Sequence, residues 1–349
     1  MKLDITDQAK HNIQWEKVDI YLRSHFPEEM DSPLLIKQFS SGYSNLTFFI
    51  QLGKLEMVMR RPPFGKIPPR SHDMKREFDI LKKIHPVFPL APQPLLYADD
   101  PHLMDKHFFI MEKKQGIVLD DNIPPSIENI PFMQEKISNT VVDTLVKLHD
   151  ININENGIKD LGKPEGFLKR QVEGWSKRYF HSTDEPHPLA EEIIEWLQSN
   201  LPSSPPAAIV HNDLKLNNMM LDSNNPAVVN GVFDWELCTV GDPLTDLATS
   251  VAYWTEPNDK ETGLTSVTRR EGFMTRREFI EKYALASGRN VDNIDYYLTF
   301  SFFKIAVILQ QIYYRWRQGE IEDSRFSRLN TGINNLIEQS HLASRKVLL

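Results

Sequence analysis

The chain reads Val210-His-Asn-Asp213-Leu-Lys-Leu-Asn-Asn218-Met-Met-Leu221, then a polar turn, then Val228-Val-Asn-Gly-Val-Phe-Asp234-Trp-Glu-Leu-Cys-Thr-Val-Gly-Asp-Pro-Leu-Thr-Asp246. Three polar residues of this stretch, Asp213, Asn218 and Asp234, stand at the ends of short apolar runs. Loops held by strands place catalytic side chains at such positions. The turn formers from Asp222 to Pro226 predict a hairpin, which would bring Asn218 and Asp234 opposite each other.

The residue types at these positions indicate a particular chemistry. An amide oxygen beside a carboxylate suits Mg²⁺, which prefers hard oxygen ligands and takes few of them from the protein. Asp213 precedes Asn218 closely enough to accept a proton from a hydroxyl that attacks a phosphoryl group. The stretch therefore predicts a phosphoryl-transfer centre. In the alternative, structural interpretation, Asp213 and Asp234 cap loops and Asn218 is a turn residue.

Length and composition limit the kind of protein. With 349 residues, 40% hydrophobic and 25% charged, the chain can bury a large core and is expected to form two domains or two lobes. A net charge of −8 argues against nucleic acid or an acidic membrane as the main partner. The single cysteine, Cys238, excludes an intrachain disulfide. Because no signal-peptide core and no spanning apolar run is evident, we expect a cytoplasmic protein.

Apolar periodicity separates a strand-rich first part from a helical second part. In the first part we expect a helix over 12–26, strands over 34–39, 45–52 and 55–60, a helix over 71–85, and strands over 95–98 and 107–111. From residue 126 onward helices are expected over 126–149, 164–181, 188–200, 242–254, 274–287, 292–317 and 325–346, interrupted only by the strand-like stretch 207–235. The polar stretch from Lys113 to Gly116 is the predicted boundary between lobes 1–113 and 114–349.

Longer motifs resemble a known family. His211 to Asn218 resembles the catalytic loop of the protein-kinase-like fold, and Asp234-Trp-Glu stands where protein kinases carry Asp-Phe-Gly. Phe233 to Glu236, with Gly241-Asp-Pro243 and Asp246-Leu-Ala248, is similar to the aminoglycoside phosphotransferase and choline kinase superfamily. Within it, the chain resembles the branch of kinase-like domains fused to certain acyl-CoA dehydrogenases.

The resemblance implies an α+β, protein-kinase-like fold of two lobes. Its N-lobe would be a small antiparallel sheet with one key helix that binds the nucleotide, and its C-lobe would be larger and mostly helical. The resemblance also implies Asp213 as the catalytic base, His211 as a brace for the loop, and Asn218 and Asp234 as Mg²⁺ ligands. Lys215 would touch the transferred phosphate, or would be a solvated loop lysine.

The nucleotide side departs from the protein-kinase pattern in two ways. The glycine-rich loop is replaced by a short one, so that the phosphates of ATP would be covered by Ser41, Gly42, Ser44 and Asn45. Arg60 stands where kinases carry a lysine, with Glu77 as the matching helix carboxylate, whereas strand alternation would turn Arg61 away. By the same resemblance, Met111 and Glu112 would lie at the hinge, where the backbone meets adenine.

The phosphate acceptor stays open. The segment from Lys169 to Tyr179 mixes cations with aromatics, which favours an anionic acceptor such as a hydroxyacyl-CoA, although a solvated amphipathic helix has the same pattern. The short link from Asp234 to Asp242 argues against a protein kinase controlled by loop phosphorylation. We therefore expect ATP- and Mg²⁺-dependent phosphorylation of a small-molecule hydroxyl. The alternatives are an aminoglycoside or choline-type kinase and a catalytically silent nucleotide-binding module that partners acyl-CoA metabolism.

Overall fold

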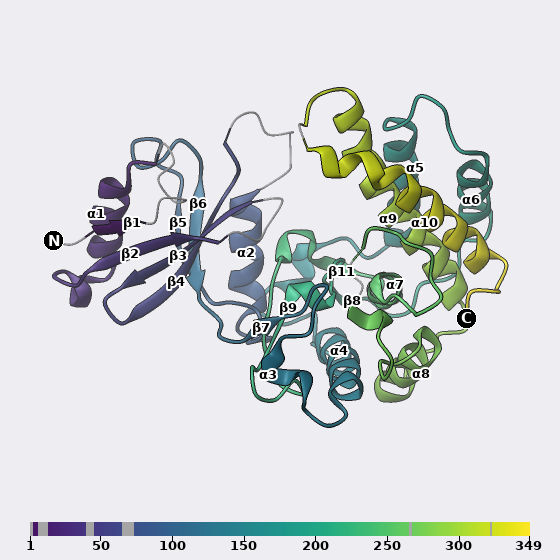
Figure 1. Cartoon of the computed structure of the whole chain (residues 1–349), viewed down its shortest axis with the longest axis horizontal. Helices are drawn as coiled ribbons and strands as arrows, with labels where there is room; N and C mark the ends of the chain where they lie inside the picture. Colours follow the sequence, from purple (N-terminus) through teal and green to yellow (C-terminus); the bar gives the residue numbers. More distant parts are fainter. Residues whose placement is uncertain (1–2, 6–12, 40–44, 65–72, 265–266, 322) are drawn as a thin grey trace. The chain divides into compact units, whose positions relative to one another are not determined.

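The computed structural model describes residues 3–5, 13–39, 45–64, 73–264, 267–321 and 323–349. The chain divides into two compact units (Figure 1). The first consists of Met1–Gln115 together with Gly231–Glu236, and the second of Gly116–Asn230 together with Leu237–Leu349. The short segment that contains Asp234 therefore packs with the N-terminal part of the chain, although it lies far from it in the sequence.

The first unit is built on a six-stranded sheet. Its strand order is β1 (Leu3–Ile5), β2 (Leu34–Gln38), β3 (Leu46–Leu52), β4 (Leu55–Arg61), β6 (Phe108–Glu112) and β5 (Pro94–Ala98). All neighbours are antiparallel except β1 and β2, which pair in parallel. The predicted strands are confirmed to within a residue or two. Strand β1 was not expected, because three residues are too few to show a period.

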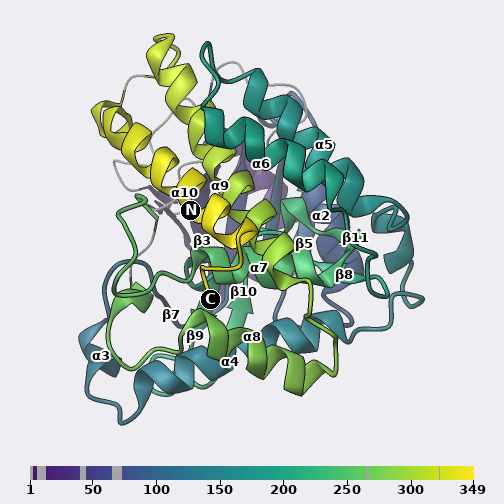
Figure 2. The same ribbon diagram turned by 90° about the vertical axis from the view of Figure 1, so that its right-hand side faces the viewer.

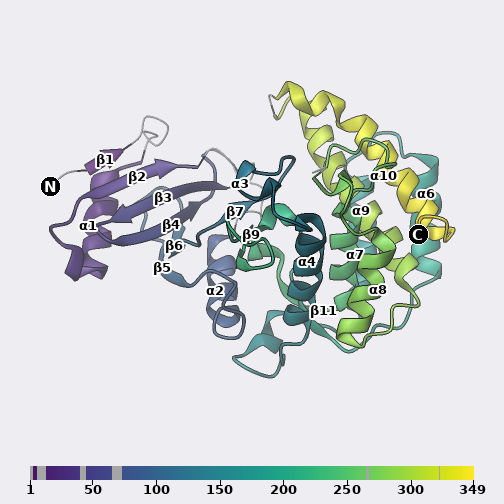
Figure 3. The same cartoon turned by 60° about the horizontal axis from the view of Figure 1, so that its bottom comes forward.

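Strand alternation gives the sheet two different faces. On one face, Phe48 and Ile50 of β3 and Met57 and Met59 of β4 belong to one apolar core with residues of helix α1 (Trp15–His25). Figure 3 shows α1 beside this sheet. The intervening residues of the same strands, among them Arg60, must then point to the opposite face, since successive side chains of a strand alternate. Helix α2 (Met74–Ile84) contacts β5 and β6, and its Phe78 ring lies 6.1 Å from that of Phe109.

The second unit is mostly helical. Its helices are α3 (Pro125–Glu128), α4 (Met133–His149), α5 (Phe167–Phe180), α6 (Pro188–Ser199), α7 (Pro243–Tyr253), α8 (Arg276–Ser287), α9 (Ile294–Arg317) and α10 (Leu329–Ser344). Helix α9 packs against both α7 and α10 (Figure 2), and its N-terminal half, from Ile294 to Val307, is buried. None of the described helices combines the length and apolar character needed to cross a lipid bilayer.

Two helix predictions need correction. The single helix expected over 126–149 is two helices, because Pro131 cannot continue an α-helix and Phe132 has a φ of 56°. The helix expected over 325–346 begins with the 3₁₀ turn Ser324–Arg328, and its α-helical part starts only at Leu329. The other helices of this unit are confirmed, with ends displaced by at most three residues.

Short strands also occur between residues 117 and 241. Strand β9 (Met219–Leu221) lies between β7 (Ile117–Val118) and β10 (Val229–Val232), and β8 (Ala208–Val210) pairs with β11 (Thr239–Gly241). The prediction that strands after residue 126 would occur only over 207–235 was therefore wrong for β11, and β7, before residue 126, was not expected. Each strand is too short to show a period, and each pairs with a strand that is distant in the sequence, β7 with β9 and β11 with β8.

Candidate active site

The loop from His211 to Asn218 begins directly after Val210, the last residue of β8. Asp246, in the first turn of α7, forms hydrogen bonds with its backbone. The fully buried carboxylate of Asp246 accepts the backbone N–H of His211 at 2.6 Å and that of Asn212 at 2.7 Å. These bonds secure a strained turn, because Asn212 has a φ of 67°, which non-glycine residues rarely adopt.

Asp246 is itself supported by further buried groups. The Nε2 atom of His149 lies 3.3 Å from its Oδ2, and the Nδ1 atom of His149 lies 2.7 Å from the hydroxyl of Tyr283. Burial alone would raise the pKa of Asp246, but the hydrogen bond and charge of His149 and the contacts with His211 hold that pKa below its usual value. Asp246 is therefore a carboxylate at neutral pH and can accept both loop N–H groups.

Within the loop, the predicted catalytic residues come together. The amide nitrogen of Asn218 donates to the Asp213 carbonyl at 2.8 Å and to its carboxylate Oδ2 at 2.9 Å. The ammonium of Lys215 lies 3.1 Å from the same Oδ2. The Nδ1 atom of buried His211 accepts the backbone N–H of Asp213 at 3.3 Å. Because Asn218 uses its nitrogen in both bonds, its amide oxygen is the atom that could face a cation.

One face of α7 contacts the loop at three successive points. Asp246, Ser250 and Tyr253 are spaced i, i+4 and i+7, so they lie on one side of the helix. Ser250 donates to the Leu214 carbonyl at 2.6 Å, and the Lys215 ammonium lies 4.3 Å from the centre of the Tyr253 ring. Sequence reasoning missed Ser250 and Tyr253. Their helical spacing from Asp246 was the available signal.

Helix α9 adds a buried cation that sequence reasoning also missed. Lys304 is only 5% exposed, and its ammonium donates to the Asn212 carbonyl at 2.9 Å. Burial lowers its pKa, against the opposing pull of the carboxylates of Asp213 and Asp246. Lys304 is 92 residues from its partner, so no local pattern could have revealed it.

A second polar group forms in the first unit. Arg60 of β4 contacts two carboxylates, with Nη1 at 2.5 Å from Oε1 of Glu77 and Nη2 at 3.2 Å from Oδ1 of Asp234. Arg61 points to the other face, where it is fully buried, lies 3.1 Å from Asp105 and stacks on Phe64. Strand alternation therefore separates the two arginines as predicted.

The electrostatics of this group follow from burial. Glu77 is 1% exposed, and burial together with the carboxylates of Asp234 and Glu236 raises its pKa to about 7 in spite of Arg60. Burial would lower the pKa of Arg60, but the surrounding carboxylates raise it, so the guanidinium stays charged. The charged state of the Glu77 carboxyl therefore depends on Arg60, because Arg60 opposes the rise in pKa that burial causes.

Asp234 is held in position by its neighbours. It follows β10 with a φ of 69°, and the next residue, Trp235, is fully buried with its ring against that of Phe88 at 5.7 Å. The indole N–H of Trp235 donates to the Val232 carbonyl at 2.7 Å. The buried Trp235 fixes the backbone next to Asp234, whose own side chain is 34% exposed. Asn212 and Asp234 thus both carry unusual backbone angles, which cluster at functional sites.

The sheet face that carries Arg60 also carries an apolar row. Phe49, Val58 and Met111 are cross-strand partners in register, and Val58 and Met111 are buried. The row was not predicted apart from Met111. Glu112 points to the opposite face, and its backbone N–H already donates to the Gln93 carbonyl at 2.8 Å. That donor is therefore not available to a base.

The structure describes only one end of the loop over residues 41–45, which is predicted to cover the phosphates of ATP. Asn45 is buried, whereas Ser41, Gly42 and Ser44 lie outside the residues that the structure describes. The predicted contacts of that loop with phosphates therefore stay predictions.

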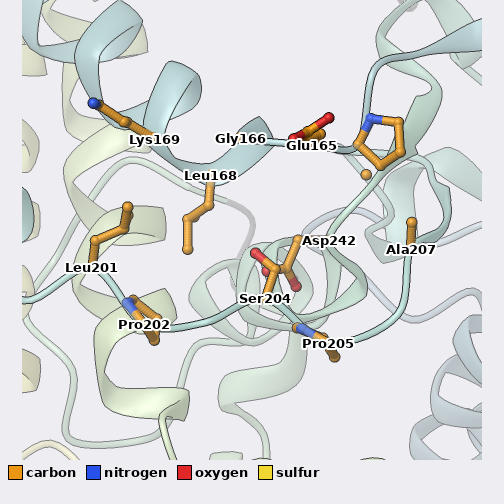
Figure 4. Close-up of a pocket in the computed structure, with 12 residues that line it drawn as sticks. Glu165, Gly166, Leu168, Lys169, Leu201, Pro202, Ser204, Pro205, Ala207 and Asp242 are labelled. Atoms are coloured by element: carbon orange, nitrogen blue, oxygen red, sulfur yellow. The ribbon is translucent and has the colours of Figure 1, made fainter.

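A separate pocket of about 400 Å³ lies in the second unit, between the start of α5 and the proline-rich segment before β8 (Figure 4). Leu168 points into it, and Asp242 lies at its floor close to Ser204. Asp242 caps α7 by accepting the Leu244 N–H at 2.9 Å, and it accepts the Tyr297 hydroxyl at 2.8 Å. Burial raises the pKa of Asp242. No residue from 211 to 218 lines this pocket.

Known proteins are similar to this chain in sequence and in fold. Rat acyl-CoA dehydrogenase family member 11 is 33% identical over 363 residues, which cover 100% of this chain but 46% of that protein. The chain thus spans about half the length of this curated relative.

Three solved structures superpose over nearly the whole chain. A protein from Ralstonia eutropha, provisionally assigned as an aminoglycoside phosphotransferase, has a TM-score of 0.79 and 26% identity, and covers 96% of this chain and 99% of its own. Choline kinase from Cryptosporidium parvum has a TM-score of 0.65, 18% identity and coverage of 96% and 98%. An aminoglycoside phosphotransferase in complex with ADP and hygromycin B has a TM-score of 0.61, 14% identity and coverage of 94% and 98%.

These similarities confirm the protein-kinase-like fold and the resemblance to the aminoglycoside phosphotransferase and choline kinase superfamily, including its branch with acyl-CoA dehydrogenases. The sequence model of one family, described as the phosphotransferase enzyme family, matches residues 35–280. The chain belongs to the phosphotransferase enzyme family.

Proposed function

We propose that this chain catalyses ATP- and Mg²⁺-dependent phosphorylation of a hydroxyl on a small molecule. The observation that carries the proposal is the Asp213 carboxylate, which Asn218 and Lys215 both contact, in a loop that buried Asp246 holds in place. A loop serving only as a connection would not need a strained turn and a buried carboxylate to fix one aspartate, whose side chain is 17% exposed.

In the proposed reaction, Asp213 orients the acceptor hydroxyl and finally takes its proton. The hydroxyl oxygen forms the new bond to the γ-phosphorus as the bond to the bridging oxygen of ADP breaks. Lys215, 3.1 Å from Asp213, meets the transferred phosphoryl group as its charge develops. His211 acts as the brace, because its Nδ1 atom fixes the backbone of Asp213.

The nucleotide side of the proposal rests on the first unit. Arg60 would contact the phosphates while Glu77 keeps its guanidinium oriented, since a planar fork can serve two anions at once. The apolar row of Phe49, Val58 and Met111 lies on the same sheet face and suits the flat surface of a base. Ser41, Gly42, Ser44 and Asn45 would cover the phosphates, and Met111, on the same sheet face as Arg60, would mark the edge of the base site.

The donor set fits Mg²⁺. Asn218 offers its amide oxygen because its nitrogen is committed to Asp213, and Asp234 offers a carboxylate of which Arg60 contacts only one oxygen at hydrogen-bonding distance. When bound, Mg²⁺ would neutralise charge on the phosphates. We propose these two residues as its protein ligands.

Cations beside the catalytic loop favour an anionic acceptor, such as a hydroxyacyl-CoA. The Arg178 guanidinium lies 4.6 Å from the centre of the Trp175 ring, and the Lys304 ammonium lies 6.0 Å from the same ring. Lys215 and Lys304 are thus the cations near Asp213, and Arg178 shares the Trp175 ring with Lys304. A polycationic aminoglycoside or a choline-type alcohol would meet repulsion here.

The test measures ATP consumption with hydroxyacyl-CoA thioesters, sugars, choline-like alcohols and aminoglycosides as acceptors. Asp213→Asn should lower turnover by roughly 10²- to 10⁴-fold, because the general base is lost, and should leave ATP binding intact. Asp222→Asn, in the exposed hairpin turn, is the matched control and should keep full turnover. Equal turnover in Asp213→Asn would refute the assignment. ATP binding without turnover on any acceptor would favour a catalytically silent nucleotide-binding module.

A further inference from the structure

The end of α7 places an aromatic ring against the catalytic lysine. Tyr253 is the last residue of α7, two helical turns after Asp246. The Lys215 ammonium lies over its ring at 4.3 Å from the centre, well within the range in which a cation is attracted to an aromatic face. Lys215 is also within 3.1 Å of Asp213, so its ammonium lies between a carboxylate and a ring.

The hydroxyl of Tyr253 belongs to the same group. Burial raises the pKa of Tyr253, and the charge of Asp213 raises it further while that of Lys215 opposes the change. At neutral pH the hydroxyl is therefore protonated and can donate to the Asp213 carboxylate.

The rest of this helix face shows why the arrangement is more than core packing. Asp246 and Ser250 precede Tyr253 on the same face, and each makes a hydrogen bond to the loop backbone. Tyr253 is the only one of the three that contacts loop side chains instead of loop backbone. A residue needed only to fill space would have no reason to face both Asp213 and Lys215.

We propose that Tyr253 is a positioning residue of the phosphoryl-transfer centre. Its ring holds the Lys215 ammonium beside Asp213, where the transferred phosphoryl group would arrive, and its hydroxyl orients the Asp213 carboxylate. The short link between Asp234 and Asp242 has no long activation segment that could supply such a group, so the end of α7 provides it. This inference rests on the proposed function.

The kinetic test compares two substitutions in the full chain. Tyr253→Leu removes ring and hydroxyl and should lower kcat roughly tenfold, because Lys215 is no longer held, while the KM for ATP stays unchanged. Tyr253→Phe keeps the ring and should lose less. Tyr296→Phe is the matched control, since it removes a buried hydroxyl that donates to the Leu197 carbonyl at 2.8 Å, in the same unit. It should keep wild-type kcat.

A double-mutant cycle separates positioning from simple destabilisation. If Tyr253 acts through Lys215, Tyr253→Leu should have little further effect on kcat in the Lys215→Met background. An equal fall of kcat in both backgrounds would overturn the proposal.

A second readout does not depend on turnover. The rate at which an amine-acetylating reagent modifies Lys215 is followed by mass spectrometry, with the 67%-exposed Lys169 as internal reference and buried Lys304 as a check on folding. Lys215 should react several-fold faster in Tyr253→Leu and at the wild-type rate in Tyr253→Phe. Unchanged reactivity in Tyr253→Leu, or equal acceleration in Tyr253→Phe, would overturn the positioning role. A wild-type chain that transfers no phosphate would instead count against the proposed function.

Discussion

Removing Arg60 should destabilise the first unit far more than removing a surface arginine. The guanidinium of Arg60 is 12% exposed and its partner Glu77 is 1% exposed, so Arg60→Met leaves a buried carboxylate without its cation. Breaking a buried pair in this way typically costs about 3–5 kcal/mol. We expect the lower end, about 3 kcal/mol, because the pKa of Glu77 is already raised to about 7 and the carboxyl can escape the penalty by taking up a proton.

The assay is urea unfolding of the full chain, followed by a signal from the first unit. Arg345→Met is the matched control, since Arg345 is 63% exposed and its pair with Glu192 at 3.0 Å should contribute less than about 1 kcal/mol. Arg60→Lys should fall between the two, because a lysine keeps the charge but cannot contact Glu77 and Asp234 with one planar fork. Equal stability of Arg60→Met and wild type would refute the reasoning that the pair is formed and charged.

Two further substitutions test the supports of the site. Asp246→Asn should lower kcat and cost about 2 kcal/mol of stability, because an amide cannot accept the N–H groups of His211 and Asn212 as a carboxylate does. The pKa of Asp246 is lowered in the folded state, so its contribution should persist above pH 3.8 and be lost only as the pH falls further, which thermal melts across pH can check. Phe49→Ala should raise the KM for ATP roughly tenfold with little change in kcat, measured by steady-state kinetics, if the apolar row receives the base. An unchanged KM would place the base elsewhere.

Local sequence patterns were sufficient to predict most of the helices and strands. The strands from Leu34 to Arg61 are short, mostly apolar runs separated by turn formers, and the long helices show the helical period, so both were predicted to within a few residues. The differences fall where local patterns carry little information. The break at Pro131 was missed within a longer helical period, β11 was missed, and β7 was not predicted, because both strands are too short to show a period.

The loop residues His211, Asp213, Lys215 and Asn218 could be named from sequence because they lie within eight positions of each other and share a distinctive pattern of residue types. Arg60 could be preferred to Arg61 for a similar local reason, since alternation along one strand decides which of two neighbours points to which face. Such inferences need only the geometry of a single element.

The supports of the site could not be predicted in this way. Lys304 reaches the Asn212 carbonyl from a helix 92 residues away, and Tyr253 reaches Lys215 from the far end of α7. The sequence by itself determined most element types and the orientation of Arg60, and it predicted the chemistry of the loop. Only the tertiary structure decided which distant cations, rings and carboxylates surround Asp213, because such contacts depend on how whole helices pack and leave no period in the chain.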